Sequence, residues 1–278
     1  MSRKFNSILN RVHELRGIDF SGYRHRSLSR RIEFRLAKLG INDNDEYLEL
    51  LDSDPTECDE LIDTIAINVS AFFRDPIVYE ILAQRVIPDI IEKKRKSGLR
   101  QLRIWSAGCA CGEEPYSLAM LTHKALKKDP SEWSIHIFAT DIDKESLRRA
   151  EKASFPRESL LHTKLEFVFE YFECIESDYL VKPEIREMVH FSNDDLTSMT
   201  TFALKESIFG EFDIIFCRNV LIYLNDELQS QVMEKFVHSL DSTGYLFLGE
   251  AEQLNTDIIS NFQIVDSRNR VFKKCITS

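Results

Sequence analysis

The chain has 278 residues, of which 43% are hydrophobic and 29% charged. This composition fits a globular protein with one large domain or two of ordinary size. No apolar run approaches the ~20 residues of a membrane-spanning helix, and the N-terminal stretch lacks the apolar segment of a secretory signal. We therefore expect a cytoplasmic protein without membrane insertion. The six cysteines show neither disulfide nor zinc spacing, so we expect no metal.

The net charge of −10 is unevenly distributed. Residues 1–40 hold eight arginines and two lysines against Glu14, Asp19 and Glu33, which is +7, so the remainder carries −17. This asymmetry indicates an acidic partner for the basic segment, either nucleic acid or an acidic protein surface.

Residues 1–90 are typical of helices. The stretch "SGYRHRSLSRRIEFRLAKLG" predicts a helix that begins at a serine cap and ends at Gly40. Four cations form a stripe roughly 60° wide beside its apolar face: Arg24, Arg31, Arg35 and Lys38. The stripe is either a solvated face or a docking surface. Nucleic acid is disfavoured because few aromatic residues lie among these cations and the rest of the chain is acidic.

Helices should also form in "NDNDEYLELLDSD" and "TECDELIDTIAIN". Residues 76–98 predict a further helix, which Pro88 should kink. The charged run "EKKRKSGLR" (92–100), which begins within this stretch, resembles a hinge. We therefore divide the chain into a helical domain with its linker helix, residues 1–90, and a second domain, residues 91–278.

Strands and helices alternate after residue 100. The predicted strands lie in "LRIWSA", "SIHIFATD", "EMVHFSNDDL", "FDIIFCRNVLIYL" and "GYLFLGEAE". This alternation favours an α/β fold with a parallel, doubly wound sheet. A final hairpin, "FQIV" and "RVFKKC", should add an antiparallel edge. Residues 155–187 interrupt the alternation, and we interpret them as a small inserted β-rich subdomain.

The loop "SAGCACGEEP" follows the first strand, where open α/β sheets bind ligands. Gly108 and Gly112 permit a sharp turn close to a ligand. Glu113 and Glu114 would repel a phosphate, but they suit the ammonium and sulfonium of S-adenosylmethionine (SAM). The alternative is that acidic residues merely favour a helix N-terminus.

Three later strands also end in polar residues. Asp141 ends "FATDID" and can accept both hydroxyls of a ribose, whereas Asp143 is expected to cap the next helix. "NDDL" (193–196) and "CRN" (217–219) can offer polar groups to an adenine. Together these strand ends predict a nucleoside site without phosphate.

Four stretches in order along the chain resemble a known family: "NVSAFFRDP" (68–76), "SAGCACGEEPYSLAM" (106–120), "FATDID" (138–143) and "FDIIFCRNVLIYL" (212–224). They look like the bacterial chemotaxis receptor methyltransferases, the CheR family. The resemblance implies a class I SAM-dependent methyltransferase domain, an N-terminal helical domain and a three-stranded antiparallel β-subdomain. It also implies methyl transfer from SAM to glutamate side chains on the cytoplasmic helices of chemoreceptors, with S-adenosylhomocysteine (SAH) as product.

The resemblance also implies site residues. With Gly108 of the loop, the expected cofactor-binding set is Asn68, Ser70, Arg74, Gly108, Glu114, Asp141, Asp195, Leu196, Arg218 and Asn219. Arg74 and Tyr223 would be catalytic by orienting the incoming carboxylate and the cofactor. The basic stripe would dock on the acidic receptor helices. The sequence departs from the family at Ser70, where threonine is common, at Ala110–Cys111, where hydroxyls are usual, and at Asp195, where asparagine is common.

Other readings stay open at this stage. Arg74 could form a salt bridge with Asp75 or another carboxylate, and Tyr223 could be a core tyrosine with a satisfied hydroxyl. The whole chain could be a SAM- or SAH-binding regulator without turnover, or a nicotinamide or nucleotide enzyme, although Glu113 and Glu114 argue against the last. Nothing in the sequence requires more than a monomer.

Overall fold

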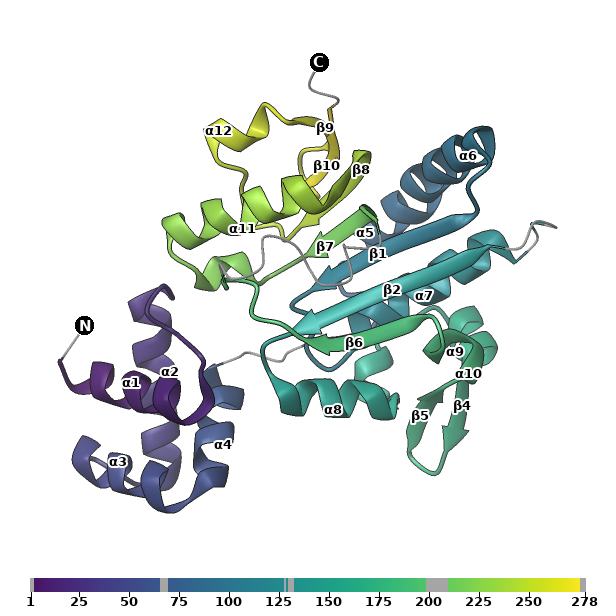
Figure 1. Ribbon diagram of the computed structural model, residues 1–278. Coiled ribbons are helices and arrows are strands. Elements are labelled where there is room, and N and C mark those ends of the chain that lie inside the picture. Colours follow the sequence, from purple (N-terminus) through teal and green to yellow (C-terminus); the bar gives the residue numbers. More distant parts are fainter. Residues whose placement is uncertain (1–2, 66–69, 128, 130–132, 199–209, 276–278) are drawn as a thin grey trace. The chain divides into compact units, whose positions relative to one another are not determined.

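The computed structural model describes residues 3–65, 70–127, 129, 133–198 and 210–275 (Figure 1). The chain forms two compact units: residues 1–68 with 221–230, and residues 69–220 with 231–278. The division therefore falls near residue 68 and not near the expected hinge after residue 90. The helices of residues 76–97 belong to the second unit, because their apolar side chains join its core.

The first unit is helical. Its elements are α1 (Arg3–Arg16), α2 (His25–Leu39), α3 (Asn44–Ser53), α4 (Pro55–Ile65) and the 3₁₀ turn η4 (Leu221–Tyr223). Ile8, Leu28, Ile32, Tyr47 and Leu61 are buried at its centre. The segment 221–230 joins this unit because Tyr23 and Leu224 form a β-bridge.

Helix α2 ends as predicted but begins later. Gly40 closes it in the left-handed conformation, with φ of 74°. The helix begins at His25 and not directly after Ser21. The N–H of Ser21 donates instead to Asp19 Oδ1, in a turn that precedes the helix.

The second unit contains a seven-stranded sheet in the order β6-β2-β1-β7-β8-β10-β9. Its strands are β1 (Gln101–Ala107), β2 (Ser134–Asp141), β6 (Val189–Asn193), β7 (Phe212–Cys217), β8 (Leu240–Leu248), β9 (Phe262–Asp266) and β10 (Val271–Lys274). The first five run parallel, and the final hairpin is antiparallel. The predicted doubly wound sheet with an antiparallel edge is thus confirmed.

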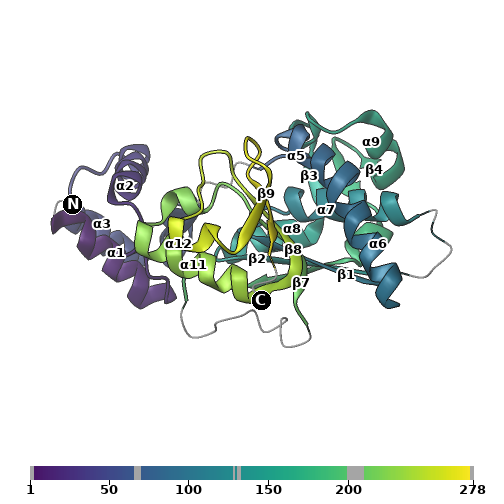
Figure 2. The same cartoon turned by 90° about the horizontal axis from the view of Figure 1, so that it is seen from above.

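Helices cover both faces of this sheet (Figures 1 and 2). They are α5 (Pro76–Ile81), the π-helical turn η1 (Leu82–Val86), α6 (Ile87–Ser97), α7 (Glu113–Leu126), α8 (Lys144–Lys152), α11 (Asp226–Ser239) and α12 (Thr256–Ile259). Side chains alternate along β1, so Ile104 joins the core beneath α6 and α7, whereas Trp105 packs edge-on against Phe236 of α11. The π-turn directly precedes Pro88, where the sequence predicts a kink.

The interruption at 155–187 is a small three-stranded antiparallel sheet with short helices. It comprises β3 (Ser154–Pro156), η2 (Arg157–Leu160), α9 (Leu165–Tyr171), β4 (Phe172–Ile175), β5 (Asp178–Val181) and α10 (Pro183–Arg186), with strand order β3-β5-β4. This confirms the predicted subdomain. Among the described helices of the whole chain, none has the length and apolar character needed to cross a membrane.

Candidate active site

The loop after β1 uses its own amides within the protein. The N–H groups of Gly108 and Cys109 both donate to Thr140 O, at 2.8 and 3.0 Å. Ala110 N–H donates to Asp141 Oδ2 at 2.8 Å, and Gly112 N–H donates to Cys109 O. A phosphate-binding loop points such amides at its ligand. Because these four are already engaged, the loop is not arranged to hold a phosphate.

The shape of the loop depends on Gly108. Its φ of 78° is left-handed, and a Cβ added there would lie 2.4 Å from Val220 Cγ2. The loop therefore packs directly on the turn that follows β7. Gly112 is also left-handed, with φ of 98°. The sharp turn predicted from the two glycines is present, and the close approach of Gly108 is to Val220.

Glu114 is the loop's accessible carboxylate. It lies in the first turn of α7, is partly buried, and accepts a hydrogen bond from the neutral hydroxyl of Ser106 at 2.7 Å. Burial raises the pKa of Glu114 to about 7; nearby Glu252 raises it further, while Arg218 and Arg74 oppose the shift. A carboxylate that is poorly solvated and has a neutral partner is stabilised by a cationic ligand.

Glu113 does not share this role. Glu113 is 4% exposed, and its carboxylate faces Ser159 of η2 and Ser70. The Ser159 hydroxyl lies 3.4 Å from Glu113 Oε1. Burial raises the pKa of Glu113 as well. Of the two acidic residues in the sequence motif, Glu113 thus connects the loop to neighbouring segments, and Glu114 remains the candidate for ligand binding.

Asp141 stands at the end of β2 next to the loop. Its two carboxylate oxygens accept the N–H groups of Ala110 and Asp143, at 2.8 and 2.9 Å. Each carboxylate oxygen can accept a second hydrogen bond, so the side chain retains acceptor capacity for a vicinal diol. Asp143 caps α8 as predicted, because its side chain accepts from Glu145 N and Ser146 N.

Asp195 and Leu196 follow β6. Asp195 Oδ1 accepts hydrogen bonds from the N–H and the hydroxyl of Thr197, so it stabilises its own turn. Arg218 and Asn219 follow β7, which is separated from β6 by β2 and β1. At about 4.8 Å per strand, the ends of β6 and β7 lie roughly 14 Å apart. Contact of these four residues with an adenine and its surroundings stays a prediction.

Arg218 instead organises the segment that contains Arg74. Its guanidinium forms an ion pair with Asp75 at 3.0 Å and donates to Arg74 O and Leu248 O, at 3.4 and 3.3 Å. Phe73 and Asp75 on either side of Arg74 have left-handed φ values of 54° and 58°. Such backbone costs about 1–3 kcal/mol per residue and is typical of functional sites. Asp75 thus has an ion-pair partner in Arg218, and the role of Arg74 stays a prediction.

For two predicted site residues the described structure gives no contact with the site. Asn68 lies outside the described residues. Tyr223 belongs to η4 in the helical unit, where its carbonyl accepts the N–H of Arg24 at 2.7 Å and its ring lies within electrostatic range of Arg31. Its contact with the reacting groups stays a prediction.

The predicted docking stripe is divided between the interior and the surface. Arg35 is 5% exposed and pairs with Glu57 at 2.5 Å, so it does not present its charge to a partner. Arg31 donates to Thr64 O at 2.8 Å, and burial lowers its pKa. Arg24 and Lys38 are exposed. The stripe departs from the expectation because two of its four cations turn toward α4.

Sequence reasoning missed Glu252. It is 3% exposed and lies after β8, with its carboxylate accepting the N–H groups of Val220 and Gly249. The same signal that singles out polar residues after four strands, a polar side chain just beyond a strand end, also marks Glu252 after β8.

These residues fit a cationic nucleoside without phosphate. Glu114 can hold an ammonium, Asp141 can hold a ribose, and the loop amides are engaged with β2 and with the loop itself. Together with the doubly wound sheet and its antiparallel final hairpin, this defines the class of Rossmann-like, SAM-dependent methyltransferases.

Comparison with known protein families identifies one family within this class of methyltransferases. The model described as "CheR methyltransferase, SAM binding domain" matches residues 68–271, and "CheR methyltransferase, all-alpha domain" matches residues 3–66. The chain belongs to the CheR methyltransferase family, and its cofactor is SAM.

Curated relatives cover most of the chain. It is 34% identical to the chemotaxis protein methyltransferase of Listeria innocua, covering 86% of this chain and 85% of the relative. It is 31% identical to that of Escherichia coli, covering 90% and 84%. It is also 32% identical, over 92% of its length, to an uncharacterized 104.1 kDa protein of Rhodobacter capsulatus, of which it spans only 26%.

Proposed function

We propose that this enzyme is a protein-glutamate O-methyltransferase that modifies glutamate side chains on the cytoplasmic helices of chemoreceptors, as part of adaptation in chemotaxis. The relatives named above support the pathway, because they are chemotaxis protein methyltransferases. The observation that carries the chemistry is the turn at Phe73–Asp75. Its strained backbone, held by Arg218, keeps Arg74 within electrostatic range of Glu114.

The proposed mechanism needs positioning more than proton transfer. SAM supplies a methyl group on a sulfonium, which is electrophilic. A glutamate with a pKa of about 4.3 is ionised at neutral pH and needs no general base. Glu114 would hold the ammonium of the cofactor and Asp141 its ribose, and Arg74 would orient the incoming carboxylate. Alignment of this kind, with water excluded, can supply most of the rate enhancement.

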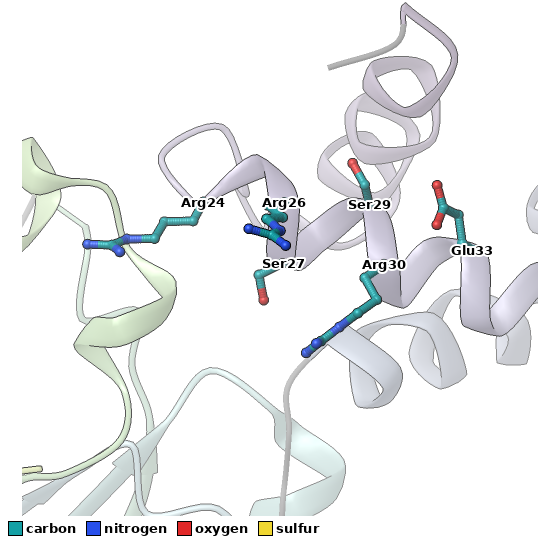
Figure 3. Close-up of a pocket in the computed structure, with 6 residues that line it drawn as sticks. All are labelled: Arg24, Arg26, Ser27, Ser29, Arg30 and Glu33. Carbon is teal, nitrogen blue, oxygen red and sulfur yellow. The ribbon is translucent and has the colours of Figure 1, made fainter. Parts of the chain in front are cut away.

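Receptor docking is assigned to the exposed cations of α2. Arg24, Arg26 and Arg30 line an open hollow of about 660 Å³ with Ser27, Ser29 and Glu33 (Figure 3). All three arginines are exposed, as is Lys38 at the end of the helix. A basic surface of this kind attracts acidic helices, mainly by accelerating encounter, and the effect weakens with salt.

Transfer to glutamate is tested with purified receptor cytoplasmic fragments and methyl-labelled SAM. We expect label on glutamate side chains, identified by mass spectrometry of receptor peptides and released by mild base. Glu114→Gln should abolish labelling. Label on another residue type, or no label from a protein that still binds SAH, would contradict the proposal.

The docking surface is tested by charge reversal. Arg26→Glu with Arg30→Glu should slow receptor methylation about tenfold at low salt, with a smaller difference at high salt. Lys152→Glu, an exposed reversal at the end of α8, is the matched control. Equal rates for the double variant and the control at low salt would remove α2 from the proposal.

A further inference from the structure

Glu252 is a buried carboxylate that the proposed chemistry does not use, and it bonds the turns that follow β7 and β8. Both oxygens of this buried carboxylate accept backbone N–H groups. Oε1 accepts from Val220 at 2.9 Å, and Oε2 accepts from Gly249 at 2.5 Å. Hydrogen bonds to an ionised acceptor are about twice as strong as neutral ones. Glu252 therefore joins the turn after β7 to the turn after β8.

The turn after β7 needs such support. Asn219 adopts a left-handed φ of 62°, which is uncommon outside glycine. It also packs against Gly249, where an added Cβ would lie 2.8 Å from Asn219 N. Arg218 immediately before it holds Asp75, and Val220 immediately after it fills the space beside Gly108. Residues 218–220 thus contact, in turn, the turn at Phe73–Asp75, Gly249 and the loop at Gly108.

The geometry points to Glu252 as a positioning residue that fixes residues 218–220, and through Val220 the loop at Gly108, in the arrangement required for cofactor binding and methyl transfer. It acts through the backbone and needs no contact with SAM. Its charge also reaches Glu114 and Cys217, whose pKa values it raises in addition to the larger effect of burial. A cationic cofactor beside Glu114 therefore relieves repulsion between two carboxylates.

The test compares Glu252→Gln with Glu250→Gln, an identical chemical change at an exposed residue two positions earlier. The amide keeps the size of the side chain but places an NH₂ donor against one backbone donor. In the unliganded protein we expect hydrogen exchange at the Val220 and Gly249 amides to accelerate at least about tenfold. In calorimetry, SAH binding should weaken, and Glu250→Gln should match wild type in both measurements.

A kinetic measurement separates a positioning role from an effect on stability. This measurement rests on the proposed function, whereas hydrogen exchange and SAH binding are independent of it. Glu252→Gln should lower kcat by about a hundredfold with a smaller change in KM for SAM. Unchanged exchange at the two amides, or SAH affinity and kcat equal to those of Glu250→Gln, would overturn the inference.

A second variant covers the case in which Glu252→Gln does not fold. Val220→Ala keeps the backbone hydrogen bond to Glu252 and removes only the side chain that fills the space beside Gly108. It should weaken SAH binding while the Gly249 amide stays protected. Wild-type affinity in Val220→Ala would show that the β7 turn does not position the loop.

Discussion

Arg218 and Asp75 lie 143 residues apart in the chain and 3.0 Å apart in space. The side chain of Arg218 is 4% exposed, and that of Asp75 is 55% exposed. Arg218 also donates hydrogen bonds to the carbonyls of Arg74 and Leu248. One guanidinium thus fixes the turn containing Arg74 to the ends of β7 and β8.

Arg218→Lys tests this relationship. An ammonium cannot reproduce the planar fork that spans three acceptors, so the turn at Phe73–Asp75 should relax. We expect kcat for methyl transfer to fall by about a hundredfold. Arg268→Lys, at an exposed position, should leave kcat unchanged. A kcat within about twofold of wild type in Arg218→Lys would show that the turn keeps its geometry without the guanidinium.

SAH affinity should depend on pH through Glu114. With a pKa of about 7 in the unliganded protein, Glu114 is mostly protonated at pH 6 and ionised at pH 8. The ammonium of SAH requires the ionised form, so Kd should rise by up to about tenfold per pH unit below pH 7. Burial also raises the pKa of Asp141, so the comparison with Glu114→Gln isolates one group. A pH dependence identical in wild type and Glu114→Gln would exclude this cause.

Ionisation of Glu114 should favour SAH binding but destabilise the unliganded protein. The folded-state pKa of Glu114 is raised from 4.5, so its favourable contribution is fully present below pH 4.5 and is lost as the pH rises to about 7. Glu114→Gln should therefore unfold at a higher temperature than wild type at pH 8, with little difference near pH 4.5. Equal midpoints at pH 8 would indicate that the carboxylate is well solvated.

Arg35 should be a structural residue. Its guanidinium pairs with Glu57, which also accepts the Tyr47 hydroxyl at 2.6 Å, inside the helical unit. Removing one partner of a buried pair typically costs about 3–5 kcal/mol. Arg35→Ala should lower the free energy of unfolding by that order, whereas Lys38→Ala should change it by less than about 0.5 kcal/mol. Denaturant titration gives both values, and equal stabilities would show that the Arg35–Glu57 pair does not stabilise the helical unit.

The fold was largely predictable because hydrophobic periodicity and strand–helix alternation are local. The five parallel strands, the final hairpin and the interrupting β-subdomain all follow from such patterns. The domain boundary was not predictable from the sequence, because a charged run such as "EKKRKSGLR" is equally compatible with a hinge and with an exposed helix end. Helix α6 ends in this run while its other face joins the core.

Side-chain roles within the site were only partly predictable. The strand-end rule placed Asp141 beside the loop that precedes Glu114, because neighbouring parallel strands end at the same edge, and the hydrogen bond from Ala110 N–H to Asp141 agrees with this placement. The sequence does not show which of the two adjacent acidic residues is buried against neighbouring segments. It therefore predicts the same ligand-binding role for Glu113 and Glu114. Helical spacing likewise placed Arg35 beside Arg24, although the acidic partner on α4 that draws Arg35 inward is 22 residues away.

The central claim is that Glu114 and Asp141 hold the cofactor. It is tested most directly by calorimetric titration of the purified protein with SAH, for wild type, Glu114→Ala and Asp141→Ala. Glu151→Ala, at an exposed position of α8, is the control. We expect micromolar binding in wild type and in the control, and loss of binding in both site variants. Undiminished binding in either site variant would contradict it.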